Sequence, residues 1–214
     1  MMKRFLMLLL LLGAMINSRE AAAQKTADQL LKSTVDKIRA TPNLKIEFSY
    51  QMINTKAGIN EKKSGTLFLN GDAYKVLIDG QTIVSDGKTV WTYLPGSNEV
   101  MVSNAGVGEE SLNPTNLLTS YSKDYKASFT NDKTNTAKGL KTIELKAGAG
   151  SKFPKVLVGV KEAAEQLGRL VIFDNGGNQF IYDLSGMTPN ASLTRNFFTF
   201  NPADYPGIDV VDMR

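Results

Sequence analysis

The sequence predicts a mainly β protein of the α+β type, in which an antiparallel meander of strands follows an opening helix. Three observations predict it. Apolar and polar residues alternate over 44–52, turn residues separate the short apolar runs that follow, and residues 26–40 combine a capping signal with helical spacing. We expect about ten or eleven strands with two or three helical segments. No repeat, low-complexity tract or linker interrupts the chain, so we expect a single domain over residues 24–214.

The amino end has the layout of a secretory signal peptide. A basic start at Met1–Arg4 precedes an apolar run, Phe5–Leu12, and the small residues Ala21–Ala23 provide a cleavage site before Gln24. The apolar run is too short to anchor the chain by spanning a bilayer. We therefore expect residues 1–23 to be removed, near Ala23, and the mature chain to be an unanchored protein outside the cytoplasm.

The opening helix is predicted from its first turn and its apolar face. Thr26 and Gln29 stand at the spacing of a capping box, and Pro42 ends the helical pattern. The apolar face consists of Leu30, Leu31, Val35 and Ile38.

The strands that follow are separated mostly by tight turns. Asp86-Gly87 is the strongest hairpin signal, because this dipeptide fits a two-residue turn. A second helix is expected to begin at Asn113-Pro114, where an N-cap residue precedes a proline at the first helical position. The expected strands include 44–52, 65–69, 82–84, 89–93, 169–173, 179–184 and a last long one over 192–200.

The composition excludes most catalytic chemistry. The chain has no cysteine, hence no disulfide, no thiolate nucleophile and no cysteine zinc site. It also has no histidine, which removes the usual general base and the serine–histidine arrangements. Lysine–serine dyads and carboxylate pairs remain possible, but the acidic residues are scattered. We expect no enzyme, no cofactor and no metal site.

Nucleic acid is not an expected partner either. The formal net charge is +4, but the predicted signal peptide holds Lys3, Arg4 and Arg19 against Glu20, and its removal lowers the charge to +2. No basic cluster with interleaved aromatic residues remains. The glycine-rich stretch 147–152 lacks the spacing of a phosphate-binding loop, and 85–88 fits a hairpin turn better than an active-site loop.

The apolar strand faces leave two interpretations open. They form either the solid core of an ordinary barrel or sandwich, or the lining of a cavity, and periodicity does not distinguish the two.

Two stretches resemble a known family. Residues 65–69, G-T-L-F-L, and 83–95, I-V-S-D-G-K-T-V-W-T-Y-L-P, resemble the outer-membrane lipoprotein carrier family, LolA. The ending F-T-F-N-P at 198–202, followed by Gly207–Val210, is similar to the family's closing strand. The resemblance implies a half-open antiparallel β-barrel with helices covering its concave side.

The resemblance also implies a function. It is that of a periplasmic chaperone that binds the acyl chains of lipoproteins in a hydrophobic cavity and moves them from the inner to the outer membrane. The implied partners are acylated lipoproteins, an inner-membrane ABC lipoprotein-release complex and an outer-membrane lipoprotein receptor, with the carrier a monomer. One chain of roughly sixteen carbons would cost on the order of 12 kcal/mol to expose in water.

The cavity candidates that follow from the resemblance are the apolar strand faces. They are Ile46, Phe48, Tyr50, Met52, Leu67, Leu69, Val76, Ile78, Trp91, Tyr93 and Met101, with Leu117, Leu118 and Tyr121 on the lid side. For each residue singly, solid core packing stays an equal alternative. If Trp91 lines a cavity, its fluorescence should shift when an acyl ligand binds.

One position departs from the family. The best-studied members of the family carry an arginine just after the glycine-led strand, where it holds the lid shut by hydrogen bonds, and that position is Gly71 here. Another polar group then closes the lid, or the lid is looser, or the cargo differs. The alternatives to a lipoprotein carrier are a carrier of another lipid or glycolipid, and a lipoprotein-sensing regulator built on the same fold.

Overall fold

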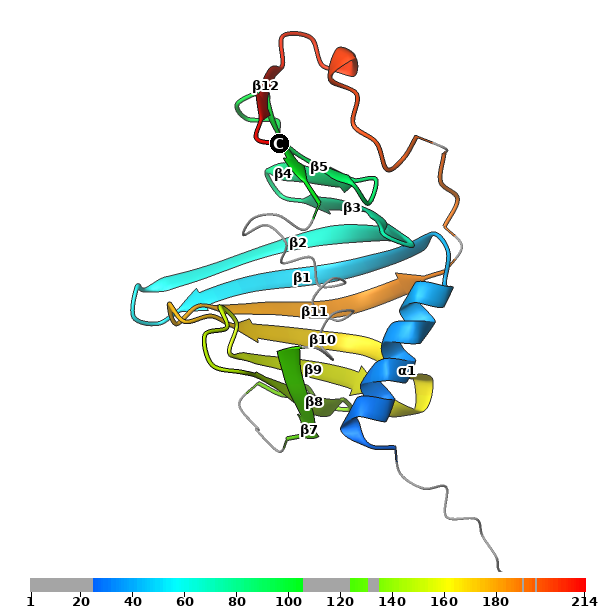
Figure 1. Cartoon of the computed structure of the whole chain (residues 1–214), viewed down its shortest axis with the longest axis vertical. Helices are drawn as coiled ribbons and strands as arrows, with labels where there is room; N and C mark the ends of the chain where they lie inside the picture. Colours follow the sequence, from blue (N-terminus) through cyan, green and yellow to red (C-terminus); the bar gives the residue numbers. More distant parts are fainter. Residues whose placement is uncertain (1–24, 106–123, 131–134, 190, 195) are drawn as a thin grey trace, which may run out of the picture.

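The computed structural model describes residues 25–105, 124–130, 135–189, 191–194 and 196–214, and these ranges form one twelve-stranded sheet with a helix across one face (Figure 1). The strand order is β12-β6-β5-β4-β3-β2-β1-β11-β10-β9-β8-β7. Neighbouring strands are antiparallel except β12, which runs parallel to β6. The elements are α1 (Ala27–Ala40), β1 (Leu44–Asn54), β2 (Ile59–Asn70), β3 (Ala73–Ile78), β4 (Gln81–Ser85), β5 (Thr89–Leu94), β6 (Glu99–Asn104), β7 (Tyr125–Phe129), β8 (Lys141–Ala147), β9 (Lys155–Lys161), β10 (Gln166–Phe173), β11 (Gln179–Thr188) and β12 (Asp209–Asp212).

The predicted fold class is confirmed: the chain is mainly β, and its sheet is open and antiparallel, as in a half-open barrel. The described residues form one strand more than the upper expectation. The predicted signal peptide, and the predicted second helix with Leu117, Leu118 and Tyr121, lie outside the described residues.

Helix α1 begins and ends where the sequence indicates. Thr26 Oγ1 accepts a hydrogen bond from the Gln29 N–H at 3.2 Å, and Gln29 Oε1 accepts one from the Thr26 N–H at 2.9 Å. This is the reciprocal pair of a capping box. At the other end Thr41 is extended, as expected for a residue that precedes a proline.

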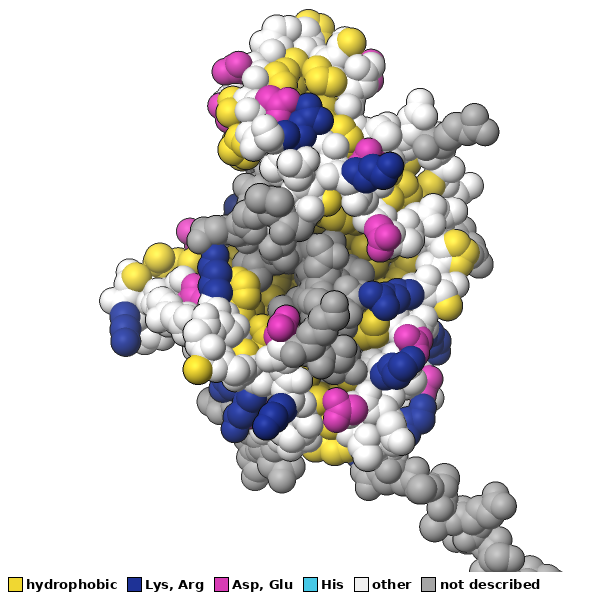
Figure 2. Space-filling model, viewed as in Figure 1, with side chains coloured by type: hydrophobic (Ala, Val, Ile, Leu, Met, Phe, Trp, Pro, Cys, Tyr) yellow, Lys and Arg dark blue, Asp and Glu magenta, His cyan; other side chains and the backbone are white. Residues whose placement is uncertain are grey.

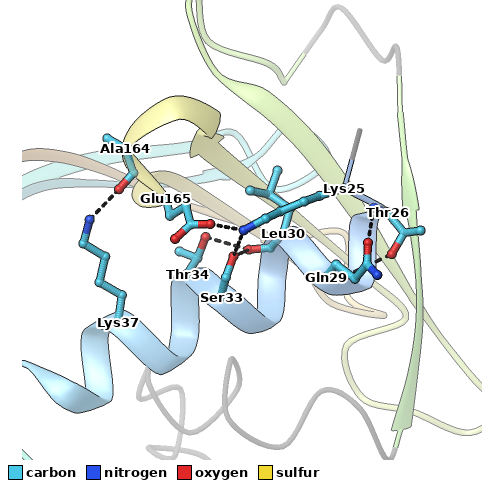
Figure 3. Close-up of polar contacts among 9 residues, drawn as sticks. All are labelled: Lys25, Thr26, Gln29, Leu30, Ser33, Thr34, Lys37, Ala164 and Glu165. Carbon is cyan, nitrogen blue, oxygen red and sulfur yellow. Dashed lines mark hydrogen bonds and ion pairs between the residues drawn. The ribbon is translucent and has the colours of Figure 1, made fainter. Parts of the chain in front are cut away.

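The apolar face of α1 packs on one end of the sheet. Leu30 and Leu31 have no exposed surface and join a core cluster with β8, β9 and β10. Polar contacts to the connection between β9 and β10 hold the outer side of the helix: Lys37 Nζ donates to the Ala164 carbonyl at 2.7 Å, and Lys25 pairs with Glu165 (Figure 3). The sheet partners of the helix are Ile143, Leu145, Val156, Val158, Val160, Leu167, Leu170 and Ile172.

Strand β2 begins at Ile59, well before the predicted start at Gly65. The chain turns at Gly58, where φ is +69°, and Ile59 pairs with Asn54. Pairing of β2 with β3 begins only at Gly65, so residues 59–64 have a strand neighbour on one side alone. A two-stranded arm of this kind tolerates polar residues on both faces, which explains why the alternation signal is missing. The β1–β2 arm extends past β3 (Figure 1).

The predicted strand over 192–200 is wrong. No residue of this range that the structure describes is in a strand, and the last strand is β12 instead. The aromatic residues of the segment contact the sheet through their side chains: Phe197 packs edge-on against Phe68 at 4.8 Å between ring centroids, and Phe200 joins a buried cluster with β4 and β6. The apolar run therefore reflects packing across a sheet face rather than backbone pairing.

Candidate functional site

The face of the sheet that carries α1 also carries most of the predicted cavity residues; we call it the hollow face. Ile46 pairs with Leu67, and Leu67 with Val76. Paired residues on neighbouring strands point to the same side of a sheet. In the space-filling view of this face, hydrophobic side chains of the described residues are visible at several places on the sheet, interspersed with charged ones (Figure 2). The predicted residues on the hollow face are Ile46, Phe48, Tyr50, Met52, Leu67, Leu69, Val76, Ile78 and Met101.

The glycine at the middle of β2 is required by the packing of the hollow face. Gly65 pairs with Phe48, and a Cβ at position 65 would lie 2.6 Å from Cζ of the Phe48 ring and 2.7 Å from the Leu77 carbonyl oxygen. The phenyl ring therefore lies directly over the glycine. This explains physically the glycine that leads the 65–69 motif.

The side chains of the hollow face fall into two groups by burial. Ile46, Phe48, Leu67 and Leu69 are buried and form the core of this part of the sheet. The remainder are half-buried, so they retain surface that a ligand could contact: Tyr50, Met52, Val76, Ile78 and Met101.

Further residues of the hollow face are absent from the predicted cavity residues, among them three on β11 and Ile83 of β4. Phe180, Tyr182 and Leu184 of β11 lie opposite β1, with Tyr182 paired to Tyr50. The sequence pattern over 179–184 could have identified the residues of β11, because Phe180, Tyr182 and Leu184 stand at every second position, as the apolar residues of β1 do.

Trp91 and Tyr93 are not part of the hollow face, and their assignment to it is corrected. Trp91 pairs with Val84, whereas the hollow-face residue of β4 is Ile83, which pairs with Val76. Both aromatic side chains pack on the other face, in a cluster with Phe200 of the C-terminal segment. Side chains alternate between the two faces of a strand, so an error of one residue in the assumed alternation places every second side chain on the wrong face.

The position of Trp91 changes the expected fluorescence result. Because Trp91 is the only tryptophan of the chain and lies on the opposite face, its emission is expected to stay unchanged when an acyl ligand fills the hollow face. The check is an emission spectrum at saturating ligand, with a Trp91→Phe, Ile78→Trp variant as the matched reporter on the hollow face. A shift in the native protein with none in the variant would contradict this placement.

The described residues also line a groove of about 720 Å³ across β11, β1, β2, β3 and β4. Most of the residues that line it are polar and alternate with those of the hollow face, as Glu47 and Thr66 do with their neighbours. Phe48, Ile78 and Leu184 of the hollow face also reach it. A hydrogen bond from Lys45, together with the lysine charge, lowers the pKa of Glu47. The groove therefore combines charged and hydroxyl side chains with a few apolar ones.

The predicted hairpin at Asp86-Gly87 is confirmed as a turn. Gly87 has a φ of +91°, and Asp86 Oδ1 accepts hydrogen bonds from the N–H groups of Lys88 and Thr89, each at 2.8 Å. Burial would raise the pKa of Asp86, but these hydrogen bonds hold it below its usual value. The carboxylate is thus committed to shaping the turn.

The described residues contain no cluster of three or more residues suited to hold a metal ion. No helix among them is long and apolar enough to cross a membrane.

Fold and site together define an open-sheet protein with one recessed apolar face that a helix partly covers. The family model described as "Outer membrane lipoprotein carrier protein LolA" matches residues 78–201. The chain belongs to the LolA family.

Relatives and a solved structure agree with this membership. The outer-membrane lipoprotein carrier protein of Dechloromonas aromatica (strain RCB) is 29% identical over 181 residues, covering 82% of this chain and 84% of its own. The protein of the same name from Psychromonas ingrahamii is 26% identical and matches over the full length of both chains. An uncharacterized conserved protein from Thermus thermophilus has the same fold, with a TM-score of 0.53 at 14% identity, over 86% of this chain and 98% of its own.

Proposed function

We propose that the chain is a periplasmic carrier that binds the acyl chains of lipoproteins on the hollow face and moves them from the inner to the outer membrane. The observation that carries the proposal is the set of half-buried apolar side chains on one recessed face, contributed by strands from β11 to β6. The groove on the opposite face is lined by carboxylates among other polar side chains, Glu47 and Asp183 for example, and so suits hydrocarbon less well.

The energetics fit this task. Each methylene removed from water contributes about 0.8 kcal/mol, so a chain of roughly sixteen carbons is stabilised by on the order of 12 kcal/mol when fully covered. Half-buried side chains cover such a ligand without a closed pocket, which leaves a route for the chain to leave again. Transfer can follow differences in affinity and needs no catalytic group or cofactor in this chain.

The proposed partners follow from this route. An acylated lipoprotein would be received from an inner-membrane ABC lipoprotein-release complex and handed to an outer-membrane lipoprotein receptor. Residues 1–23 would direct export and be removed near Ala23, leaving one carrier domain over 24–214 that acts as a monomer.

The arginine latch of the family has no counterpart here. Gly71 lies in the turn between β2 and β3 with a φ of +59°, and no atom lies within 4 Å of the position a Cβ would take. This backbone conformation favours glycine over arginine. We propose that the hollow face opens without a hydrogen bond from this turn.

The test is a release assay. The mature protein is mixed with inner-membrane vesicles that hold the ABC complex and a labelled lipoprotein, and release into the soluble fraction is followed with ATP. We expect a one-to-one soluble complex with the carrier. Good binding of a free glycolipid without any soluble lipoprotein complex would contradict the proposal and favour another lipid cargo.

A further inference from the structure

A row of three polar side chains crosses the hollow face between side chains that are mostly apolar on β11 and β1. Tyr182 of β11 pairs with Tyr50 of β1, which pairs in turn with Lys63 of β2. The two phenol rings are 5.2 Å apart between centroids. We call these three residues the polar row.

The rows on either side of the polar row are largely apolar. On one side Phe180 pairs with Met52, and on the other Leu184 pairs with Phe48. Phe48 also contacts the Tyr182 ring, with centroids 6.0 Å apart. On β11 and β1 the polar row is therefore bordered by apolar side chains in both directions, whereas on β2 the next residue of this face is Glu61, which pairs with Met52.

One end of the polar row is open. Pairing between β3 and β2 starts at Gly65, so Lys63 has no partner on β3. The other end is deep: Tyr182 packs with the core cluster under α1 and with the cluster around Ile46. The polar row thus leads from the interior of the hollow face toward the β1–β2 arm.

Among the residues that the structure describes, neither the Tyr50 hydroxyl nor the Tyr182 hydroxyl has a hydrogen-bond partner. Both phenols are neutral donors. Burial raises the pKa of Tyr182, with the neighbouring Tyr50 adding to the effect. Burial likewise raises the pKa of Tyr50, and the charge of Glu61 adds to it. Each hydroxyl therefore keeps its proton at neutral pH and can donate it in a hydrogen bond.

These hydroxyls become costly when acyl chains cover the hollow face. Neither is among the buried, unpaired polar atoms of the described residues, so water accepts from them until a ligand displaces it. A hydroxyl that loses its water without gaining another acceptor is destabilising, whereas phenylalanine would supply the same ring without that cost. A ligand that brings a neutral acceptor between two apolar regions would explain two tyrosines side by side.

We propose that the hydroxyls of Tyr50 and Tyr182 donate hydrogen bonds to the ester carbonyl oxygens of a diacylglyceryl group. The inference rests on the proposed function and names the part of the cargo that this site recognises. Ester carbonyls are uncharged acceptors at the point where acyl chains join their polar linker. The acyl chains lie over the apolar rows, and the linker leaves along the polar row past Lys63.

The test compares two synthetic lipopeptides with the same chain length, one with two acyl esters and one with two alkyl ethers, which lack the carbonyls. The native protein is expected to bind the ester lipopeptide about tenfold more tightly than the ether lipopeptide, because each of the two hydroxyls contributes a factor of about three to five. In the Tyr50→Phe, Tyr182→Phe variant the two affinities become equal, while the affinity for the ether form is unchanged. Tyr93→Phe, which alters a phenol on the opposite face, is the matched control and keeps the ester preference.

The outcomes separate this inference from the proposed function. Equal affinity of the native protein for the two lipopeptides overturns the ester assignment and leaves the carrier function standing. Binding of neither lipopeptide overturns the carrier function itself. An ester preference that survives in the double variant also overturns the assignment. If the double variant does not fold, the two single variants give the same readout, because each is expected to lose part of the ester preference.

Discussion

Replacing Val76 by glutamate is expected to lower the affinity for an acylated lipopeptide at least about a hundredfold. Val76 lies on the hollow face between Leu67 and Ile83, and it is half-buried, so the longer side chain can be accommodated with its charge in the recess. A carboxylate that acyl chains cover loses its hydration, which costs several kcal/mol, and each 1.4 kcal/mol corresponds to about tenfold in affinity. Titration calorimetry or fluorescence anisotropy measures the change.

The matched control is the neighbouring residue of the same strand. Leu77 points to the opposite face and is 40% exposed, so Leu77→Glu adds the same charge where no acyl chain is proposed to bind. We expect this variant to bind within about twofold of the native protein. Equal losses in the two variants would mean that the charge acts through the fold and not through the hollow face.

Replacing Leu31 by alanine is expected to lower the free energy of unfolding by about 2 to 5 kcal/mol. Leu31 has no exposed surface and packs, with Leu30, into the cluster that joins α1 to β8, β9 and β10. The change removes apolar contacts and leaves a cavity that the surrounding β-branched residues fill only in part. Urea unfolding followed by circular dichroism gives the value.

The control for this loss is the next residue of α1. Lys32 is exposed and forms an ion pair with Asp36 at 2.5 Å, one turn further along. Exposed pairs of this kind contribute about 0.3 to 0.5 kcal/mol, so Lys32→Ala should change stability little. A loss below about 1 kcal/mol in Leu31→Ala would show that the helix is not anchored through this cluster.

The features that could be predicted from the sequence are those set by short-range chemistry. The capping box at Thr26 and Gln29 and the turn at Asp86 depend on residues only a few positions apart, and both form as predicted. The face of β1 was equally accessible, because Ile46 and Phe48 alternate with charged and hydroxyl side chains over a long strand.

The features that could not be predicted depend on distant segments. Whether Trp91 or its neighbour Thr92 lies on the hollow face is fixed by the register of β5 with β4. Thr92 is buried on one face of this strand, and Trp91 packs with Phe200 on the other. The polar start of β2 becomes a strand only because β1 is long enough to pair with it. Neither fact is encoded in the local pattern of apolar and polar residues.

The measurement that tests the central claim most directly locates the acyl chain on one face. Because the chain has no native cysteine, a single bimane fluorophore can be placed at Val76→Cys or at Leu77→Cys without a competing site. A lipopeptide with a nitroxide on its acyl chain, which quenches only at short range, is then added to each protein. The account predicts strong quenching at position 76 and little at position 77; equal quenching at both, or stronger quenching at 77, would contradict it.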